Sequence, residues 1–460
     1  MSLQSLRILG VPLLLALFGC ATPDIQTVWP EPRPLGRDIP SYRPPPQLPE
    51  VAPPAREVTN PTGVLTLAQV QALALLQHPR LAAFSWEVRA REAQILQAGL
   101  LPNPEVEVEV ENFAGSGALR DFRDTEITIL LSQLIELAGK RHKRARVAAL
   151  ERDLAAWDYE TTRVDILTQV TQAFVEVLSA QERVRLNEEL VRLAEQVLST
   201  VTERVRAGKV SPVEETRTQV ALSTSRIALE RAQRDLEAAR KRLVATWDGS
   251  IPAFASAEGT LDAIAAIPPA ERLLERIAQN PDIARWATEM VQRQAIVERE
   301  AAQRIPDPTL RGGFRHGRDT GDNALVMGVA IPLPVFNRNQ GGVLEARYRL
   351  AKAGEERRAA EAQVRAALAE AYAALSKALV EATTLKNEVL PGAQRGFDAV
   401  SEGYRQGKFG LLDVLDAQRT LFEARGQYLE ALAAYHKAVA EVERLIGAPL
   451  TEGKQARKQP

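Results

Sequence analysis

Few side chains in this chain of 460 residues have the type and spacing that metal or nucleophilic chemistry needs. Its histidines lie far apart and share no metal-ligand spacing: His78, His142, His316 and His436. The three methionines form no copper relay, and Gly312-Gly313 lies inside a strand pattern, where a phosphate loop is not expected. The sequence therefore predicts neither an enzyme nor a bound cofactor or metal.

Carboxylates are the one chemical group with regular spacing. Asp413 and Asp416 stand three residues apart, so both would lie on one face of a helix. Residues 105–111 alternate strictly between glutamate and valine, so a strand there would carry carboxylates on one face and apolar side chains on the other. Taken by itself, the aspartate pair fits a solvated helix face.

Composition and net charge limit the class of protein. The net charge of −1 shows no basic footprint for nucleic acid. The chain is rich in Ala, Leu, Glu, Arg and Gln and poor in aromatic residues, which is typical of long, packed helices. The only cysteine is Cys20, so an intrachain disulfide is excluded.

The N-terminal residues predict export and a lipid anchor. Arg7 and the short apolar run 8–18 indicate a signal peptide over residues 1–19. Leu17-Phe18-Gly19-Cys20 resembles a bacterial lipobox, in which Cys20 would be lipidated. The residues after Cys20 lack the aspartate that retains such lipoproteins at the inner membrane, so the outer membrane is expected. The alternative is an ordinary signal peptide that is cut elsewhere.

The body of the chain contains two copies of one segment about 200 residues long. Matching landmarks are turns and helix breaks: His78-Pro79 and Asn280-Pro281, Pro102-Asn103-Pro104 and Pro306-Asp307-Pro308, Arg206-Ala207-Gly208-Lys209 and Arg405-Gln406-Gly407-Lys408. We expect a proline-rich extended segment over 20–64, repeat 1 over 65–249, a connector over 250–269, repeat 2 over 270–447 and a tail over 448–460.

Each copy has the same predicted order of elements. In the first copy, a helix over 65–99 broken at Pro79 precedes a hairpin over 105–111 and 125–133. A helix over 140–207 follows, which would span roughly 100 Å, and then a turn and a return helix to about Trp247. In the second copy the corresponding ranges are 270–304 broken at Pro281, 309–316, 323–331, 342–406 with a possible kink at Pro391, and a return helix to 446.

This order predicts a mainly α protein with a small β part. Four strands cannot close a barrel, and open strand edges are not tolerated in lipid, so a spanning chain must oligomerise. Three copies would give a twelve-stranded transmembrane β-barrel, although counts of eight or sixteen also satisfy evenness. The long helices would form an internally duplicated α-barrel in the periplasm. A soluble, half-buried sheet is the alternative for the hairpins.

Two motifs resemble the TolC-like outer-membrane efflux family. Gly403-Tyr404-Arg405-Gln406-Gly407 followed by Asp413-Val414-Leu415-Asp416-Ala417 matches a pattern that stands at the same spacing in TolC. Residues 131–141 resemble the cobalt–zinc–cadmium resistance branch, which commonly has proline where Leu134 stands. The resemblance covers about residues 65–447.

The resemblance implies a homotrimer that serves as the passive exit duct of a tripartite efflux system. An inner-membrane RND-type transporter and a periplasmic adaptor, or membrane fusion protein, would be its partners, and heavy-metal cations its cargo. Drug export or type I protein export by the same fold is an alternative. A second is a lipid-anchored periplasmic coiled-coil adaptor. In either case the chain would not bind nucleic acid.

The resemblance also assigns roles to the two helical turns. The adaptor is expected to dock on both turns: Gly208, Lys209, Val210, Ser211, Gly407, Lys408, Phe409, Gly410 and Leu411. Asp413, Asp416 and Tyr404 would form a periplasmic gate, in which three chains place six carboxylates at a constriction that repels anions and holds cations. Phe409 stands where family members carry a basic residue, so that particular lock is not expected here.

Overall fold

The structure is a computed structural model that describes residues 31–45 and 60–450. The predicted signal peptide, Cys20 and the end of the C-terminal tail lie outside the described residues. The chain divides into two compact units: one contains Glu92–Ala149 and Glu298–Val343, and the other contains Val28–Arg91, Leu150–Val297 and Leu344–Pro460.

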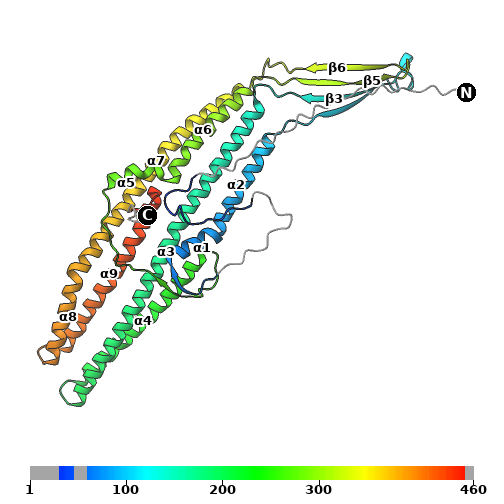
Figure 1. Cartoon of the computed structure of the whole chain (residues 1–460). Coiled ribbons are helices and arrows are strands. Elements are labelled where there is room, and N and C mark those ends of the chain that lie inside the picture. Colours follow the sequence, from blue (N-terminus) through cyan, green and yellow to red (C-terminus); the bar gives the residue numbers. More distant parts are fainter. Residues whose placement is uncertain (1–30, 46–59, 451–460) are drawn as a thin grey trace, which may run out of the picture. The chain divides into compact units, whose positions relative to one another are not determined.

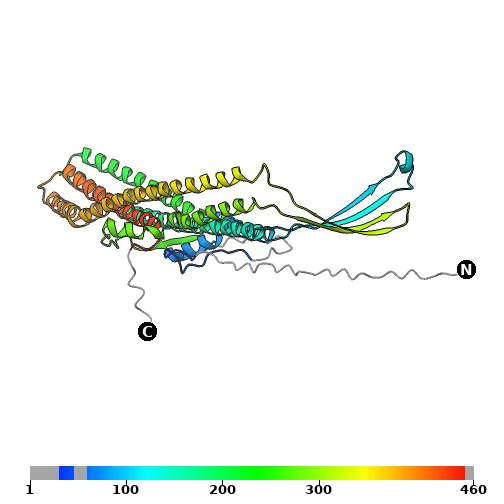
Figure 2. The same ribbon diagram turned by 90° about the horizontal axis from the view of Figure 1, so that it is seen from above.

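The first unit contains a four-stranded antiparallel sheet, visible in Figures 1 and 2. Its order is β2 (Glu105–Glu111), β3 (Glu126–Leu134), β5 (Thr309–Gly317) and β6 (Asn323–Ala330). Each copy therefore supplies one hairpin, as the alternating pattern predicts, with a short 3-10 turn, η1 (Gly117–Leu119), in the first loop. The outer strands β2 and β6 each have one edge with no partner strand among the described residues.

The register of this sheet separates its two faces. Val108 pairs with Ile129, Ile129 with Phe314, and Phe314 with Leu325, so one apolar row crosses all four strands. On the opposite face Glu109 pairs with Thr128 and Thr128 with Arg315. The apolar face is open to its surroundings, with Val106 70 % and Met327 89 % exposed. Such a face is stable only against another apolar surface, which lipid provides.

Helices make up most of the chain, and their ends follow local sequence signals. They are α1 (Leu67–Gln77), α2 (Pro79–Ala98), α3 (Lys140–Arg206), α4 (Pro212–Ala245), α5 (Ala270–Arg276), α6 (Pro281–Ala302), α7 (Gln340–Thr384), α8 (Leu390–Arg405) and α9 (Leu411–Ile446). Thr66 caps α1 in a capping box with Gln69, and Ser211 caps α4, which has Pro212 at its first position. Gly447 ends α9 in the left-handed conformation. Among the described residues, no helix is both long and apolar enough to cross a membrane.

The proline breaks expected in the second copy are present. A 3-10 turn, η2 (Ile277–Gln279), separates α5 from α6 just before Pro281. Before Pro391, a π-helical turn, η3 (Leu385–Val389), separates α7 from α8. Proline has no N–H for the regular helical hydrogen bond. At Pro391 this loss is accommodated by the π-helical turn, which is wider than an α-helical turn and holds one extra residue.

The structure corrects the count of strands. We expected four strands and an irregular connector over 250–269, but β1 (Gly63–Thr66) pairs in parallel with β4 (Phe254–Glu258) inside that connector. Both strands are short and their partners lie far apart in the sequence, so no local pattern indicates them. Phe254 is only 1 % exposed, and it joins Leu65 and Trp247 in the main core of the helical unit.

Part of the proline-rich segment packs against the helical unit. Residues 31–45 lie against α3, where Arg163 donates to the backbone oxygens of Arg33, Leu35 and Gly36. Glu160 accepts from the Arg33 N–H and forms an ion pair with Arg163 at 2.7 Å, with both side chains 3 % exposed. This buried pair is stable because further hydrogen bonds from the segment satisfy it.

Candidate functional site: the two helical turns

Two helical hairpins, α3 with α4 and α8 with α9, end in turns of the same local geometry (Figure 1). Gly208 and Gly407 have φ of +67° and +76°, a conformation that favours glycine. In the first turn, the Gly208 N–H donates to Val205 O and the Lys209 N–H to Arg204 O. Gly407 and Lys408 make the same pair of bonds to Tyr404 O and Gly403 O. Both helices thus end in the same C-terminal motif.

The return helices begin in different ways. In the first copy, the Ser211 hydroxyl accepts from the Val213 N–H at 3.3 Å. In the second copy, Gly410 has no side chain to offer, and the Asp413 carboxylate accepts from the Gly410 N–H at 2.8 Å. A carboxylate in the first turn also interacts favourably with the helix dipole. Asp413 therefore stabilises the start of α9 in addition to its predicted place in a gate.

Asp413 and Asp416 are both exposed on α9, as their spacing predicts, but their surroundings differ. Asp416 forms an ion pair with Arg419 at 2.8 Å, in which both side chains are about two-thirds exposed. An exposed pair of this kind contributes little to stability. It does place a positive charge beside one of the two predicted gate carboxylates.

Tyr404 packs the second hairpin against the first. Its side chain is 7 % exposed, in an apolar cluster with Val201, Leu411 and Val414. The guanidinium carbon of Arg204, on α3, lies 4.4 Å from the centre of the Tyr404 ring, and Arg204 also donates to Tyr404 O at 3.3 Å. Burial raises the pKa of the Tyr404 phenol, and this effect is opposed by Arg204.

Glu214 joins this contact from α4. Its charge adds to the rise of the Tyr404 pKa. One carboxylate oxygen of Glu214 and the Tyr404 hydroxyl are both buried without a hydrogen-bond partner among the described atoms. The tips of both hairpins thus meet at a partly unsatisfied polar contact, which costs free energy when the tips pack together.

The ring of Phe409 explains why residue 403, which precedes Tyr404, is a glycine. A Cβ at Gly403 would lie within about 2.3 Å of the Phe409 ring, so a larger residue there would have to displace the ring. Phe409 itself is 46 % exposed. The position that carries a basic residue in family members is therefore filled by a ring that covers the backbone of its own turn.

Most of the predicted docking residues reach the surface. Gly208, Lys209, Ser211, Gly407, Lys408, Phe409 and Gly410 are exposed, and Val210 is half-buried. Leu411 is 3 % exposed because it belongs to the cluster around Tyr404. Its place is therefore inside the tip, while the other eight residues are accessible.

Two arginines of the basic run over residues 141–144, at the start of α3, bind the end of α2. Arg141 donates to Gly99 O, and Arg144 donates to Ala98 O at 2.8 Å and to Leu100 O at 3.0 Å. These carbonyls belong to the C-terminal end of α2, where helical partners are missing.

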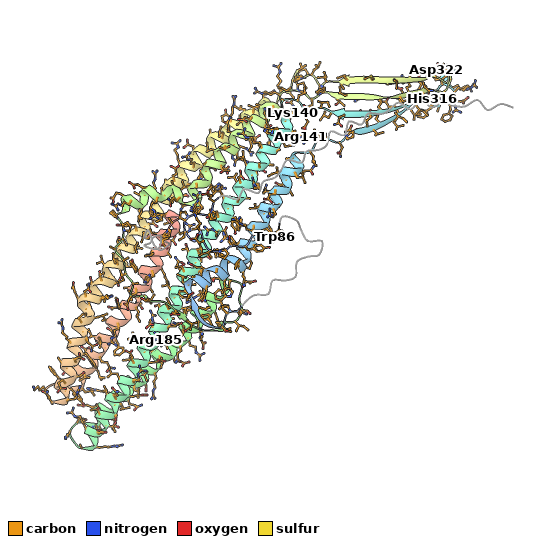
Figure 3. The ribbon with its side chains drawn as sticks, viewed as in Figure 1. Trp86, Lys140, Arg141, Arg185, His316 and Asp322 are labelled. Atoms are coloured by element: carbon orange, nitrogen blue, oxygen red, sulfur yellow. The ribbon has the colours of Figure 1, made fainter. Side chains whose placement is uncertain are left out.

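Beside this run, one contact joins the two copies. Lys140, 5 % exposed, donates to the Asp307 carboxylate at 2.7 Å and to Ile305 O. Asp307 also accepts from the Leu137 N–H at 2.8 Å. Figure 3 shows Lys140 and Arg141 at the first turn of α3. An aspartate of the second copy thus fixes the strand-to-helix junction of the first.

Three of the four histidines have a hydrogen-bond partner. His78 accepts from the Arg80 N–H, His316 bonds with Asn323, and His436 bonds with Leu261 O. Within residues 31–45 and 60–450 no group of His, Cys, Asp and Glu has the geometry to hold a metal ion.

Comparisons with known proteins agree with this architecture. The profile of the family described as "Outer membrane efflux protein" matches residues 70–249 and 274–448. The chain is 38 % identical over 385 residues to the cobalt-zinc-cadmium resistance protein CzcC of Cupriavidus metallidurans, covering 84 % of this chain and 90 % of that protein. It is 25 % identical to the pyoverdine export outer membrane protein OpmQ of Pseudomonas putida, covering 93 % and 96 %.

Solved structures share the fold. Crystal structures of CusC match with a TM-score of 0.70 at 17 % identity, covering 89 % of this chain and 99 % of that chain. The open state of the Neisseria gonorrhoeae MtrE outer membrane channel matches with a TM-score of 0.67 at 19 % identity, covering 91 % and 99 %. The predicted family and fold are confirmed. This chain belongs to the outer membrane efflux protein family and is an efflux channel of the outer membrane with a helical tunnel in the periplasm.

Proposed function

We propose that three copies of this chain form the exit duct of a tripartite efflux system that exports divalent heavy-metal cations. The four-stranded sheet is the observation that supports the trimer. Among the described residues, it has one apolar face, one carboxylate-rich face and two unpaired edges. In lipid each open edge must find a partner strand, and three copies give the even number of twelve strands.

The proposed cargo follows from the relatives and from charge. CzcC, CnrC and NccC are named for resistance to cobalt, zinc, cadmium and nickel. On the polar face of the sheet, β2 carries Glu105, Glu107, Glu109 and Glu111. The resemblance to OpmQ, named for pyoverdine export, favours a second candidate, a duct for small organic molecules or drugs. Type I protein export remains the third use of the same fold.

The partners we propose are an inner-membrane RND-type transporter, which supplies the energy, and a periplasmic adaptor. The adaptor would dock on the eight accessible turn residues of the two hairpins. Asp413, Asp416 and Tyr404 would gate the entrance. Arg204 would hold Tyr404 in the packed state. The lipid anchor at Cys20 and the division into repeats over 65–249 and 270–447 are part of the same proposal.

The test is a deletion strain complemented with this chain. We expect the deletion to lower tolerance to cobalt, zinc and cadmium and to raise cell-associated metal, measured by mass spectrometry. Tolerance to dyes and antibiotics should stay unchanged. A strain that loses drug or siderophore export while its metal tolerance is unaffected would overturn the cargo. A chain extracted from the outer membrane as a monomer would overturn the duct itself.

A further inference from the structure

We propose that a cavity between the two helical hairpins binds a small, neutral organic molecule with an apolar body and one carboxamide group. The cavity has a volume of about 520 Å³ and is lined by residues of α3, α4 and α9. Clefts that bind small molecules have volumes of about 300–1,000 Å³. The inference goes beyond the proposed export of metal cations, because it assigns to the same chain a second ligand of different chemistry.

The cavity lies within the helical unit, where helices of both copies meet. α3 and α4 supply its walls from the first copy, and α9 supplies its wall from the second. Residues 183–190 are the stretch of α3 that borders the cavity, and Figure 3 labels Arg185 on this stretch. On α9, Gln418 lies one helical turn beyond Val414, which belongs to the apolar cluster around Tyr404. The cavity therefore adjoins the packed tips of the hairpins.

Small residues on two helices create the space. Ala221 and Ser225 stand four residues apart on one face of α4, and Gly426 stands on α9. Apolar side chains also line the cavity, among them Leu186 from α3 and Phe422 from α9. Both of these side chains are half-buried in the structure. An apolar molecule in the cavity would remove them further from water, which is favourable.

The charged side chains of the lining pair with one another. Arg183 forms an ion pair with Glu430 at 3.1 Å. Arg419 lies 3.8 Å from Glu423 and also pairs with Asp416 at 2.8 Å. The side chains of Arg419, Glu423 and Glu430 are each about two-thirds exposed, so they stand at the mouth of the cavity. Among the described lining residues, every charged group has a partner of opposite charge, which favours a neutral ligand.

The amide of Gln418 is the polar group that the lining leaves unpaired. Gln418 is 5 % exposed, and its amide oxygen has no hydrogen-bond partner among the described atoms. The other uncharged polar side chains of the lining donate to backbone oxygens of their own helices: Asn187 to Arg183 O, Thr224 to Val220 O and Ser225 to Ala221 O. A buried polar group without a partner is unfavourable, so a ligand that bonds this amide gains a specific contact.

A carboxamide is the chemical complement of the Gln418 side chain. The glutamine amide offers an oxygen acceptor and N–H donors, and a flip of the amide exchanges the two ends. A ligand carboxamide also has both functions, so it can bond Gln418 in either orientation. A carboxylate cannot donate and an ammonium group cannot accept. Each of these would also bring a charge into a cavity whose own charges are already paired.

Photolabelling of the purified protein tests the site. 4-Benzoylbenzamide has an apolar diaryl body, one carboxamide and a ketone that couples to nearby C–H bonds under ultraviolet light. We expect it to label the tryptic peptides 186–192, 218–226 and 420–425, which contain lining residues of α3, α4 and α9. Benzophenone, which has the same body without the amide, should label these peptides at least tenfold less. Labelling of the exposed apolar face of the sheet should be equal for both probes and serves as the reference.

Three variants connect the labelling to the named residues. Gln418→Leu keeps the approximate shape of the side chain and removes its hydrogen-bonding groups, so the preference for 4-benzoylbenzamide over benzophenone should fall to about one. Gln427→Leu is the matched control, because Gln427 is exposed on α9 and does not line the cavity. Ala221→Phe fills the space and should reduce labelling of the three peptides by both probes. The thermal unfolding temperature of each variant shows whether it is folded.

The two probes on the unmodified chain decide the question, whether or not every variant folds. Equal labelling of the three peptides by both probes, or no labelling of them, overturns the proposal, because water alone then satisfies the Gln418 amide. A preference that persists in folded Gln418→Leu overturns the assigned role of this amide. None of these outcomes depends on metal tolerance, so failure of the proposed export function leaves the test of the cavity intact.

Discussion

The contact between Arg204 and Tyr404 gives a quantitative test of the proposed gate. The Arg204 guanidinium lies 4.4 Å from the ring centre and also donates to Tyr404 O at 3.3 Å. A partly buried cation–π contact contributes about 1 kcal/mol, and a hydrogen bond from a charged group about 1.5 kcal/mol. Arg204→Gln keeps length and some hydrogen-bonding ability, so we expect it to weaken the contact by about 2 kcal/mol in each chain.

This loss changes how often the hairpin tips separate. Because 1.4 kcal/mol corresponds to a factor of ten, about 2 kcal/mol increases the separated population roughly 30-fold per chain. The measurement is the electrolyte conductance of purified trimers in planar bilayers. We expect Arg204→Gln to increase both the frequency and the mean conductance of open events, while heat-modifiable mobility on gels shows that the trimer is intact.

Two control variants make this test specific. Arg206 lies on the same last turn of α3 and is exposed, so Arg206→Gln should leave the conductance unchanged. Tyr404→Phe keeps the ring and removes a buried hydroxyl that has no hydrogen-bond partner, so it should leave the tips packed at least as firmly. The reasoning is refuted if Arg204→Gln conducts like the unmodified chain, or if Tyr404→Phe opens the channel as strongly.

Three further predictions concern the tip, the buried ion pair and pH. Gly403→Ala should destabilise the turn by about 1–3 kcal/mol because its Cβ meets the Phe409 ring, and adding Phe409→Ala should restore the thermal unfolding temperature. Glu160→Ala leaves Arg163 buried and unpaired, so it should cost about 3–5 kcal/mol in denaturant unfolding and expose residues 31–45 to proteases. Burial raises the pKa of Glu443, so its contribution to stability is present below its unfolded pKa of about 4.5 and is lost as pH rises through the folded value. Glu443→Gln should flatten that part of a plot of thermal stability against pH, and an unchanged slope would contradict this.

Elements with a strong local period could be predicted closely. The Glu-Val alternation predicted β2 at its observed bounds, and the uninterrupted helical period predicted α3 to within a residue at its C-terminal end. The two turns could also be predicted from local sequence, because the positive φ at Gly208 and Gly407 favours glycine at these positions. The caps at Ser211 and Thr66 are also local, because each hydroxyl accepts from an N–H only two or three residues further along the chain.

Features that depend on distant partners could not be predicted in this way. β1 and β4 are short strands whose identity comes only from pairing with each other. The partner of Arg141 could not be predicted either, because the carbonyl it binds, Gly99 O, lies just after the end of α2, about 40 residues earlier in the chain. At the tip, the aspartates were visible as a motif, whereas Arg204 was not. One arginine among many on α3 gives no signal until the fold brings it over the Tyr404 ring.

The fixed charge on the polar face of the sheet bears on the proposed cargo. Arg315 forms ion pairs with Glu126 at 3.3 Å and with Glu111 at 3.8 Å. In the part of the chain that the structure describes, no ion pair is recorded for Glu105, Glu107 or Glu109. The polar face therefore keeps an excess of carboxylates on β2. In the proposed trimer this excess would be repeated three times around the lumen.

Glu105 and Glu107 are exposed and Glu109 is half-buried, and the spacing of these carboxylates suits passage better than retention. Tight binding of a divalent cation needs several ligands within coordination distance of one ion. Carboxylates at alternate positions of one strand are instead separated by about 7 Å, so each interacts with a hydrated ion on its own. Exposed charges of this kind raise the local concentration of cations, and the effect weakens at high salt. A duct that exports metal ions needs this balance, because an ion must enter readily and also leave at the outer face.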